Sequence, residues 1–217
     1  MGAIMATKGE RSRDHILTAA KQVVMSKGFS GTSIDDILAA AGVSKGAFFH
    51  HFKSKAHLAE ALMRWHAAQD LQMFRTLAAE AEARHDDPMD QMMMFLERFE
   101  DYISNPDQPS RGCMYAVYTY ENMQFSQEVT DFIADVLRQW TAIYIRKFQE
   151  ILDLYDPARP VTARQLAEMI VSIIEGGLVL QRAYGNVRVT ARQSAHFRTY
   201  LDLLFPREQR DRPAPAP

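Results

Sequence analysis

The chain has 217 residues, of which 47% are hydrophobic and 24% charged, and its formal net charge is −2. This composition is ordinary for a globular protein and excludes a chain that is disordered throughout. No apolar run reaches the roughly 18 residues that a membrane-spanning helix needs, and the first residues lack the apolar core of a secretory signal. We therefore expect a cytoplasmic protein with no membrane partner. The single cysteine, Cys113, excludes an internal disulfide and cysteine-rich zinc sites.

Charge is distributed unevenly along the chain. Up to Ala56 there are eight lysines and arginines against four acidic residues, a net charge of +4, while the remainder has 17 basic and 23 acidic residues, a net charge of −6. A basic head on an acidic body suits a protein that neutralises phosphates with one end and keeps the other end off the duplex. The pattern favours nucleic-acid binding by the N-terminal part.

The first predicted element is an amphipathic helix over Glu10–Lys27, which ends at Gly28. Residues before Lys8 are expected to form a flexible arm. The stretch that follows, from Thr32 to Lys55, is the most informative part of the chain.

Two short helices joined by a glycine turn are predicted within this stretch. Ser33 can cap the first helix, Gly42 can end it, and Ser44 can cap the second. This is the layout of a helix-turn-helix DNA reader, and the second helix has the small, polar N-terminal surface that the major groove requires. Lysines and capped helix ends on either side can contact phosphates. We predict base contacts by Ser44, Lys45, Gly46, Ala47 and His50, and phosphate contacts by Thr32, Ser33, Lys53 and Lys55.

The segment from Ile16 through Leu58, with the run GFSGTSIDDILAAAGVSKGAFFHHFKSK, resembles the DNA-binding domain of the TetR family of bacterial transcriptional regulators. Two positions depart from the family pattern. Phe49 stands where a tyrosine commonly touches phosphate, and Ala56 stands where an acidic residue is common. Phe49 is therefore included among the predicted DNA-binding positions.

The rest of the chain has helical periodicity and no strand signal, which predicts an all-α fold of about nine helices. Residues 8–55 form the predicted DNA-binding domain and 56–205 a helical effector-binding and dimerisation domain, while 206–217, rich in proline, is a disordered tail. The predicted helices run from Ala56 to about Arg84, over Met89–Ser104, from about Gly112 to Met123, over Gln127–Leu154, from a cap at Thr162 to about Tyr184, and from Thr190 to Phe205.

A single reader of this size covers too few base pairs for useful specificity, so we expect a two-fold homodimer on a double-stranded operator. The last two helices are the candidate interface. Each glycine of the pair Gly176-Gly177 costs a helix about 1 kcal/mol relative to alanine, which indicates a close backbone approach there. The resemblance implies a four-helix dimer bundle at this position. The predicted dimer contacts are Ile173, Gly176, Gly177, Leu180, Leu201 and Leu204.

The region between Met89 and Phe148 is rich in methionine and aromatic residues, most of which we expect in the core. These residue types also line adaptable apolar pockets. The resemblance implies that a small-molecule inducer binds between helices in this region, and we expect it to be apolar or aromatic. The predicted effector contacts are Phe99, Tyr102, Cys113, Tyr118, Trp140 and Tyr144.

Enzymatic chemistry has little support. Glycine-rich phosphate loops, a Gly-x-Ser-x-Gly elbow and His-Glu-x-x-His are absent. One Glu-x-x-His occurs at Glu82 and His85, but a di-iron bundle needs two such motifs and two further glutamates. His50 and His51 are adjacent and so point to different helix faces, which makes a poor metal pair. We predict no enzyme, no metal site and no cofactor.

These observations predict a dimeric repressor that a small effector releases from its operator. In the mechanism implied by the resemblance, the effector shifts body helices, the helix from Ala56 moves as a lever, and the separation of the two heads changes. Two alternatives stay open. One is a helical small-molecule-binding protein with weakened DNA reading, to which Phe49 points. The other is a regulator that senses oxidants or electrophiles through the thiol of Cys113. The competing interpretation of Cys113 is a buried cysteine with a purely structural role.

Overall fold

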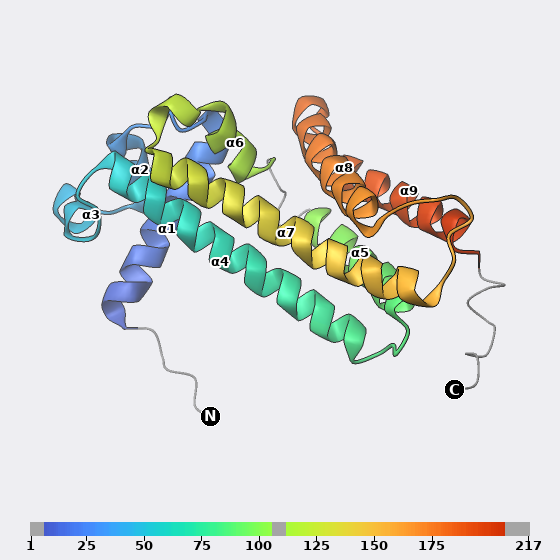
Figure 1. The fold of residues 1–217 in the computed structure, drawn as a ribbon. Coiled ribbons are helices and arrows are strands. Elements are labelled where there is room, and N and C mark those ends of the chain that lie inside the picture. The colour runs from blue at the N-terminus through green and yellow to red at the C-terminus, as the bar shows by residue number, and fades with distance from the viewer. Residues whose placement is uncertain (1–6, 106–111, 207–217) are drawn as a thin grey trace. The chain divides into compact units, whose positions relative to one another are not determined.

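A computed structural model describes residues 7–105 and 112–206 of the chain (Figure 1). Over these residues it contains nine α-helices, one short 3-10 turn (η1, Asn122–Gln124) and no strand, which confirms the predicted all-α fold. The predicted arm lies mostly, and the predicted tail almost entirely, outside the described residues. The helices are α1 (Lys8–Lys27), α2 (Ile34–Ala41), α3 (Lys45–His51), α4 (Lys55–Glu82), α5 (Pro88–Ile103), α6 (Met114–Tyr120), α7 (Gln127–Leu154), α8 (Ala163–Tyr184) and α9 (Val189–Leu204).

Most helix ends follow from local sequence signals. Ser33 and Thr162 cap α2 and α8 in capping boxes, and Ser44 caps α3 by accepting a hydrogen bond from the amide of Ala47. Gly28 and Gly42 end α1 and α2 at φ angles of 77° and 62°, a region that favours glycine. The cap residues therefore fix where the helices of the reading motif start and stop.

Two of the later helices differ from their predicted bounds. The helix expected from Gly112 to Met123 is shorter, because α6 ends at Tyr120 and the chain continues into the 3-10 turn. The last helix, expected to start at Thr190, begins one residue earlier, because α9 starts at Val189, without a side-chain cap, and contains Thr190. The buried hydroxyl of Thr190 donates a hydrogen bond to Oε1 of Gln181 at 2.9 Å.

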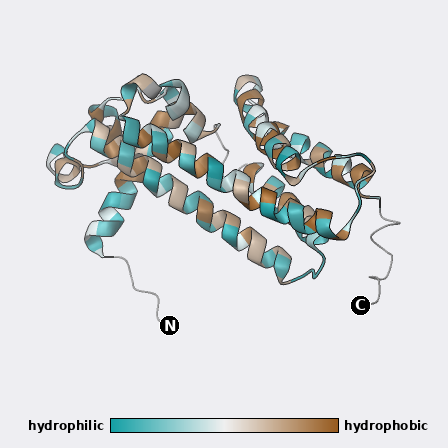
Figure 2. Ribbon diagram, in the orientation of Figure 1, coloured by the Kyte–Doolittle hydropathy of each residue, from teal (hydrophilic) through white to brown (hydrophobic). Residues whose placement is uncertain are grey.

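The described residues fall into two compact units. The first contains the residues up to Leu71 together with Met114–Ala134, so α6 and the start of α7 belong with the helix-turn-helix. Its core is formed by fully buried side chains, among them Ile16, Leu17, Phe48 and Phe52. Hydrophobic and hydrophilic residues alternate along its helices in Figure 2, as expected for helices that bury one side.

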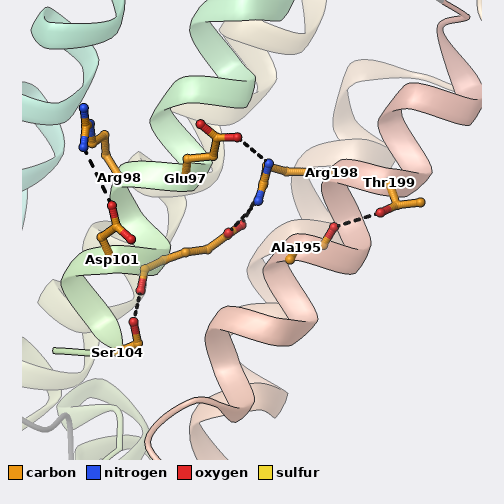
Figure 3. A network of polar contacts seen from close by, with 8 residues as sticks. Glu97, Arg98, Asp101, Ser104, Ala195, Arg198 and Thr199 are labelled. Atoms are coloured by element: carbon orange, nitrogen blue, oxygen red, sulfur yellow. Dashed lines mark hydrogen bonds and ion pairs between the residues drawn. The ribbon is translucent and has the colours of Figure 1, made fainter. Parts of the chain in front are cut away.

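The second unit contains the described residues of Gln72–Cys113 and Asp135–Pro217, with α5, α8, α9 and the larger parts of α4 and α7. Its core includes Phe148, Leu166, Phe197 and Leu201. Arg198 joins α9 to α5, with its Nη1 2.7 Å from Oε1 of Glu97, and it reaches from α9 towards this carboxylate in Figure 3. Two further bonds of 3.0 and 2.9 Å to the carboxylate of Glu100 hold the same guanidinium.

Candidate nucleic-acid interface and effector site

The N-terminus of α2 is held by short-range hydrogen bonds and an ion pair. The Ser33 amide donates to Oδ2 of Asp36 at 2.8 Å, and the Asp36 amide donates to Oγ of Ser33 at 3.1 Å. Lys27 contacts the same carboxylate at 2.7 Å. The Lys27 ammonium and the Ser33 hydroxyl hold the pKa of Asp36 well below its usual range. These contacts fix the start of α2, the first helix of the helix-turn-helix.

The outer side of α3 is small, polar and open. Ser44, Lys45, Gly46 and His50 are exposed, while Phe48 and Phe52 are fully buried on the opposite side. A Cβ placed on Gly46 would meet only Oγ of Ser44, at 3.9 Å. The structure thus brings the residues predicted at base edges to one accessible surface, the reading surface, which we define as Ser44, Lys45, Gly46, Ala47 and His50.

Phe49 and Lys53 flank the reading surface. Phe49 is 41% exposed and its ring meets that of Phe48 edge-on, with centroids 5.3 Å apart. Lys53 is exposed at the turn before α4, where the hydroxyl of Ser54 accepts a hydrogen bond from the amide of His57 at 3.1 Å. A cation beside a capped helix start is well suited to a phosphate oxygen.

Two residues predicted at phosphates direct their side chains into the protein, which gives phosphate contacts by these side chains no support. Thr32 is 2% exposed, and its hydroxyl donates to the carbonyl of Gly28 at 2.6 Å. Lys55 turns its ammonium towards Phe29, 2.7 Å from the carbonyl oxygen and 4.3 Å from the ring centroid. Desolvation by these neighbours lowers the pKa of Lys55.

Glu121 is a structural contact that the sequence did not predict. Its carboxylate accepts hydrogen bonds from the amides of Phe29 and Ser30, at 3.2 and 2.6 Å, and from the Ser30 hydroxyl at 2.6 Å. A Cβ on Gly28 would lie 2.5 Å from Oε1 of Glu121, so the glycine also makes room for this carboxylate. A single glutamate after a short helix carries no recognisable signal, and only the fold brings it to the turn between α1 and α2.

In the second unit, aromatic rings gather around Phe74. Its ring centroid lies 5.8 Å from that of Phe99, 5.5 Å from that of Trp140 and 6.3 Å from that of Tyr144. Three of the predicted effector residues therefore meet in one place. We call this group, with Phe95, the aromatic cluster.

A cavity of about 90 Å³ adjoins the aromatic cluster between α4, α5 and α7. Its apolar lining includes Met92, Phe95 and Tyr144, and Glu82 and Lys147 are also part of the wall. An engineered cavity that takes up benzene measures roughly 150 Å³. Binding of an aromatic molecule would therefore require the lining to move, and methionine is the side chain that adapts most easily.

The hydroxyl of Tyr144 is buried and has no hydrogen-bond partner among residues 7–105 and 112–206. Burial raises the pKa of this phenol above its usual range, so the hydroxyl stays protonated. It is therefore a hydrogen-bond donor without an acceptor among the described residues. A buried polar group without a partner costs roughly 1–3 kcal/mol. A ligand that brings an acceptor to this hydroxyl would recover part of that cost.

The other three predicted effector residues do not join the aromatic cluster. Tyr102 is 53% exposed on α5. Tyr118 belongs to the first unit, where its hydroxyl donates to the carbonyl of Ala59 at 3.1 Å and its ring stacks on that of Phe125. Its position in the first unit gives its assignment to an effector site at the aromatic cluster no support.

Cys113 forms a hydrogen bond with the side chain of Glu175. Burial raises the pKa of this carboxyl, and the bond with the thiol acts in the opposite direction. A carboxylate beside a sulfur repels a thiolate, so this environment works against the charged form that a reactive cysteine needs. The observed pairing thus gives the thiol-sensing alternative no support.

The predicted dimer residues separate into buried and exposed groups. Leu201 and Leu204 are 0% and 3% exposed within the chain's own core, and a Cβ on Gly177 would lie 2.9 Å from Cα of Thr190. These three residues therefore serve packing within one chain, which gives their assignment to the dimer interface no support. Gly176 has nothing within 4 Å of such a Cβ, and Leu180 is 39% exposed.

The geometry defines a helix-turn-helix DNA reader followed by a helical body with an apolar cavity. Comparison with known protein families supports this description for both the N-terminal and the C-terminal part of the chain. Residues 16–62 match the model for bacterial regulatory proteins of the tetR family, and residues 88–195 match the model for the C-terminal domain of LmrA/YxaF-like transcriptional regulators. The chain belongs to the TetR family, whose members are transcriptional regulators, and it is a DNA-binding regulator.

Individual relatives match over most of their length. The HTH-type transcriptional repressor DhaR of Mycobacterium sp. strain GP1 is 25% identical over 174 residues, which are 80% of this chain and 84% of that protein. The uncharacterized regulator YxaF of Bacillus subtilis is 24% identical, with coverage of 81% and 87%. The crystal structure of a TetR transcriptional regulator from Chloroflexus aurantiacus superposes with a TM-score of 0.74 at 26% identity, covering 91% of this chain and 98% of that one.

The described residues add two negative observations. None of their helices is both long and apolar enough to cross a membrane. No three histidine, cysteine, aspartate or glutamate side chains among them lie so that they could hold a metal ion. His50 and His51, whose ring centroids are 4.9 Å apart, are a neighbouring pair without a third such residue.

Proposed function

We propose that this regulator is a homodimeric repressor, and that a small aromatic or apolar molecule releases it from its operator by entering the cavity beside the aromatic cluster. In this proposal residues 8–55 read DNA and residues 56–205 bind the effector and form the dimer. The observation that carries the proposal is the combination of an open, polar reading surface with an apolar cavity lined by a hydroxyl-bearing ring that lacks a partner.

DNA contact is assigned to the reading surface, with Ser33, Phe49 and Lys53 at phosphates. Lys45 is its single exposed lysine, and a lysine or arginine facing guanine is the commonest specific base contact. Phosphate contacts release counterions, so affinity should fall steeply as salt increases. Replacing the usual tyrosine by Phe49 removes one hydroxyl without changing the exposed position of the ring.

The first experiment measures binding of the purified protein to DNA upstream of its own gene and to a scrambled duplex, across a salt titration. We expect specific binding at least a thousandfold tighter than binding to the scrambled fragment, with a steep salt slope. Lys45→Ala should weaken specific binding by about 1–3 kcal/mol, whereas Arg75→Ala, an exposed change on α4, should not. Equal effects of the two variants would remove Lys45 from the interface.

The dimer face is proposed on the outer side of α8 and α9. Val179, Leu180 and Leu203 are 51%, 39% and 72% exposed, and Gly176 leaves space beside them. Large apolar side chains left exposed on both helices are typical of an interface with another chain. Light scattering at micromolar concentration should report a dimer for the native chain and a monomer for Leu180→Glu. Leu154→Glu, at a 62% exposed leucine ending α7, is the matched control and should stay dimeric.

The effector site is tested with two probes of similar size, phenol and toluene. Both should release the specific DNA complex if they enter the cavity, but only phenol can accept a hydrogen bond from Tyr144. Tyr144→Phe should therefore abolish the advantage of phenol over toluene and leave the toluene response unchanged. A phenol advantage that survives in Tyr144→Phe would place the hydrogen bond elsewhere.

A further inference from the structure

A buried set of titratable side chains joins three helices of the first unit. Lys21 on α1 places its Nζ 3.3 Å from Nδ1 of His66 on α4. Nε2 of His66 lies 3.4 Å from Oδ2 of Asp70, one helical turn further along α4. The hydroxyl of Tyr115 on α6 donates to the same Oδ2 at 3.0 Å. We call these four residues the relay.

Proton positions in the relay follow from the donors at its two ends. An ammonium group has only protons to donate, so Nδ1 of His66 must accept from Lys21 and the ring proton must be on Nε2. That proton is on the nitrogen that lies 3.4 Å from Asp70, and Tyr115 donates a hydrogen bond to the same carboxylate oxygen. The His66 ring also stacks on Tyr115, with centroids 5.2 Å apart and planes 22° from parallel. The Asp70 carboxylate therefore connects to two other helices. It contacts His66, which is bonded to Lys21 of α1, and it accepts a hydrogen bond from Tyr115 of α6.

The charges in the relay are largely shielded from water. His66 is 7% exposed, and burial lowers its pKa to about 3, so the ring stays neutral. Burial raises the pKa of Asp70 to about 6, although the Tyr115 hydroxyl and the Lys21 charge act in the opposite direction. Desolvation also lowers the pKa of Lys21, against the charge of Asp70. The groups that act on Asp70 come from α1, from its own helix and from α6, and they are Lys21, His66 and Tyr115.

We propose that the relay couples operator binding to a proton, so that protonation of Asp70 loosens the hold of α4 and α6 on α1 and weakens the DNA complex. With Asp70 ionised, the buried Lys21 charge has a counter-charge and the Tyr115 hydroxyl has an acceptor. With Asp70 protonated, the counter-charge is lost and the acceptor weakens. Helix α1 contacts the first helix of the helix-turn-helix, where His15 lies 2.8 Å from the carbonyl oxygen of Ala41. A looser attachment of α1 therefore gives the helix-turn-helix conformational freedom that is lost on DNA binding.

The sign of the effect follows from the titration of Asp70. Its pKa is about 6 in the folded chain and 3.8 as the reference value, so the folded chain takes up this proton more readily than the unfolded chain. Asp70 therefore contributes stability below pH 4 that is lost as the pH rises through 6. Operator binding responds in the opposite direction, because the ionised carboxylate is the form that holds α1.

The test uses the full-length protein and the duplex that it selects from a random DNA pool at pH 7.5, and it compares affinity at pH 7.5 and pH 5. Asp70→Asn has the shape of the protonated residue. Native affinity should fall about tenfold more than that of Asp70→Asn between the two pH values, because other titrating groups are common to both proteins. Asp131→Asn, at an exposed carboxylate of α7 in the same unit, should keep the native profile.

Thermal unfolding across the same pH range gives a reading without DNA. The native chain should lose stability relative to Asp70→Asn as the pH rises through 6. If operator affinity, or stability against unfolding, changes with pH in the same way for the native chain and Asp70→Asn, the proposal is overturned. Failure to select any duplex would count against both the regulator function and the coupling. If Asp70→Asn does not fold, Tyr115→Phe should move the native transition to higher pH, and an unmoved transition would equally overturn it.

Discussion

The interiors of the two units treat buried polar groups differently. In the first unit, the buried tyrosines Tyr115 and Tyr118 donate to Asp70 and to the carbonyl of Ala59. In the second unit, the hydroxyls of Tyr144 and Ser194 are the two buried side-chain groups without a partner among the described residues. An interior whose polar groups are all hydrogen-bonded favours one geometry. A buried donor without an acceptor costs free energy, so a ligand that supplies an acceptor favours a rearrangement of the side chains around it. The paired interior of the first unit suits the fixed geometry of a helix-turn-helix, and the unpaired donor of the second unit suits the effector binding proposed above.

The largest effect expected from this difference is at Tyr115. Tyr115→Phe removes a donor from a buried carboxylate and should lower the free energy of unfolding by about 1.5–3 kcal/mol at pH 7.5. Urea unfolding at a fixed protein concentration measures this change. The matched control is Tyr120→Phe in the same helix, where the ring is 80% exposed and no loss is expected. An equal response of the two variants would contradict a role for the relay in stability.

A smaller effect is expected where α8 meets α9 in the second unit. Gly177→Ala would press its Cβ against Thr190, and overpacking of this kind costs about 1–3 kcal/mol, of which the better helix propensity of alanine offsets up to about 1. Gly176→Ala has open space and should stabilise the chain slightly. Loss of dimer in Gly176→Ala, seen by light scattering, would show that the space beside Gly176 belongs to the second chain.

The smallest effect has the opposite sign and lies at Tyr144. Tyr144→Phe removes a buried hydroxyl that has no partner, so the protein without effector should gain about 1 kcal/mol of stability. Replacing tyrosine by phenylalanine should thus destabilise the first unit at Tyr115 and stabilise the second unit at Tyr144. This difference in sign is the strictest test of the contrast between the two interiors. Destabilisation by Tyr144→Phe would show that the hydroxyl has an acceptor after all.

How much the sequence could predict depends on how local each signal is. Ser33, Gly42 and Ser44 act within a few residues, so the helix-turn-helix and its reading surface followed from the sequence alone. Lys55 could not be assigned in this way, because its position depends on Phe29, 26 residues away along the chain. The relay was missed for the same reason, since Lys21 and His66 are 45 residues apart.

The hydrophobic periodicity of a helix also does not show which other element its apolar face packs against. Leu180 and Leu201 both lie on apolar stripes, yet the first is 39% exposed and the second is fully buried in the chain's own core. Tyr118 and Tyr144 raise the same difficulty, because each is an aromatic residue on an amphipathic helix and the two belong to different units. Helix faces are readable from sequence, but their partners are set by the tertiary fold.

The composition of the first unit has a practical consequence for chimeric regulators. Because Met114–Ala134 packs with the N-terminal helices, the part of the protein that could be transplanted is discontinuous in sequence. A graft cut after residue 55 would carry Gly28 to its new host but leave Glu121 behind, and the turn at Phe29 and Ser30 would lose the carboxylate that binds it. Exchanging specificities between relatives therefore means moving two segments together, or rebuilding an acidic contact for that turn in the recipient.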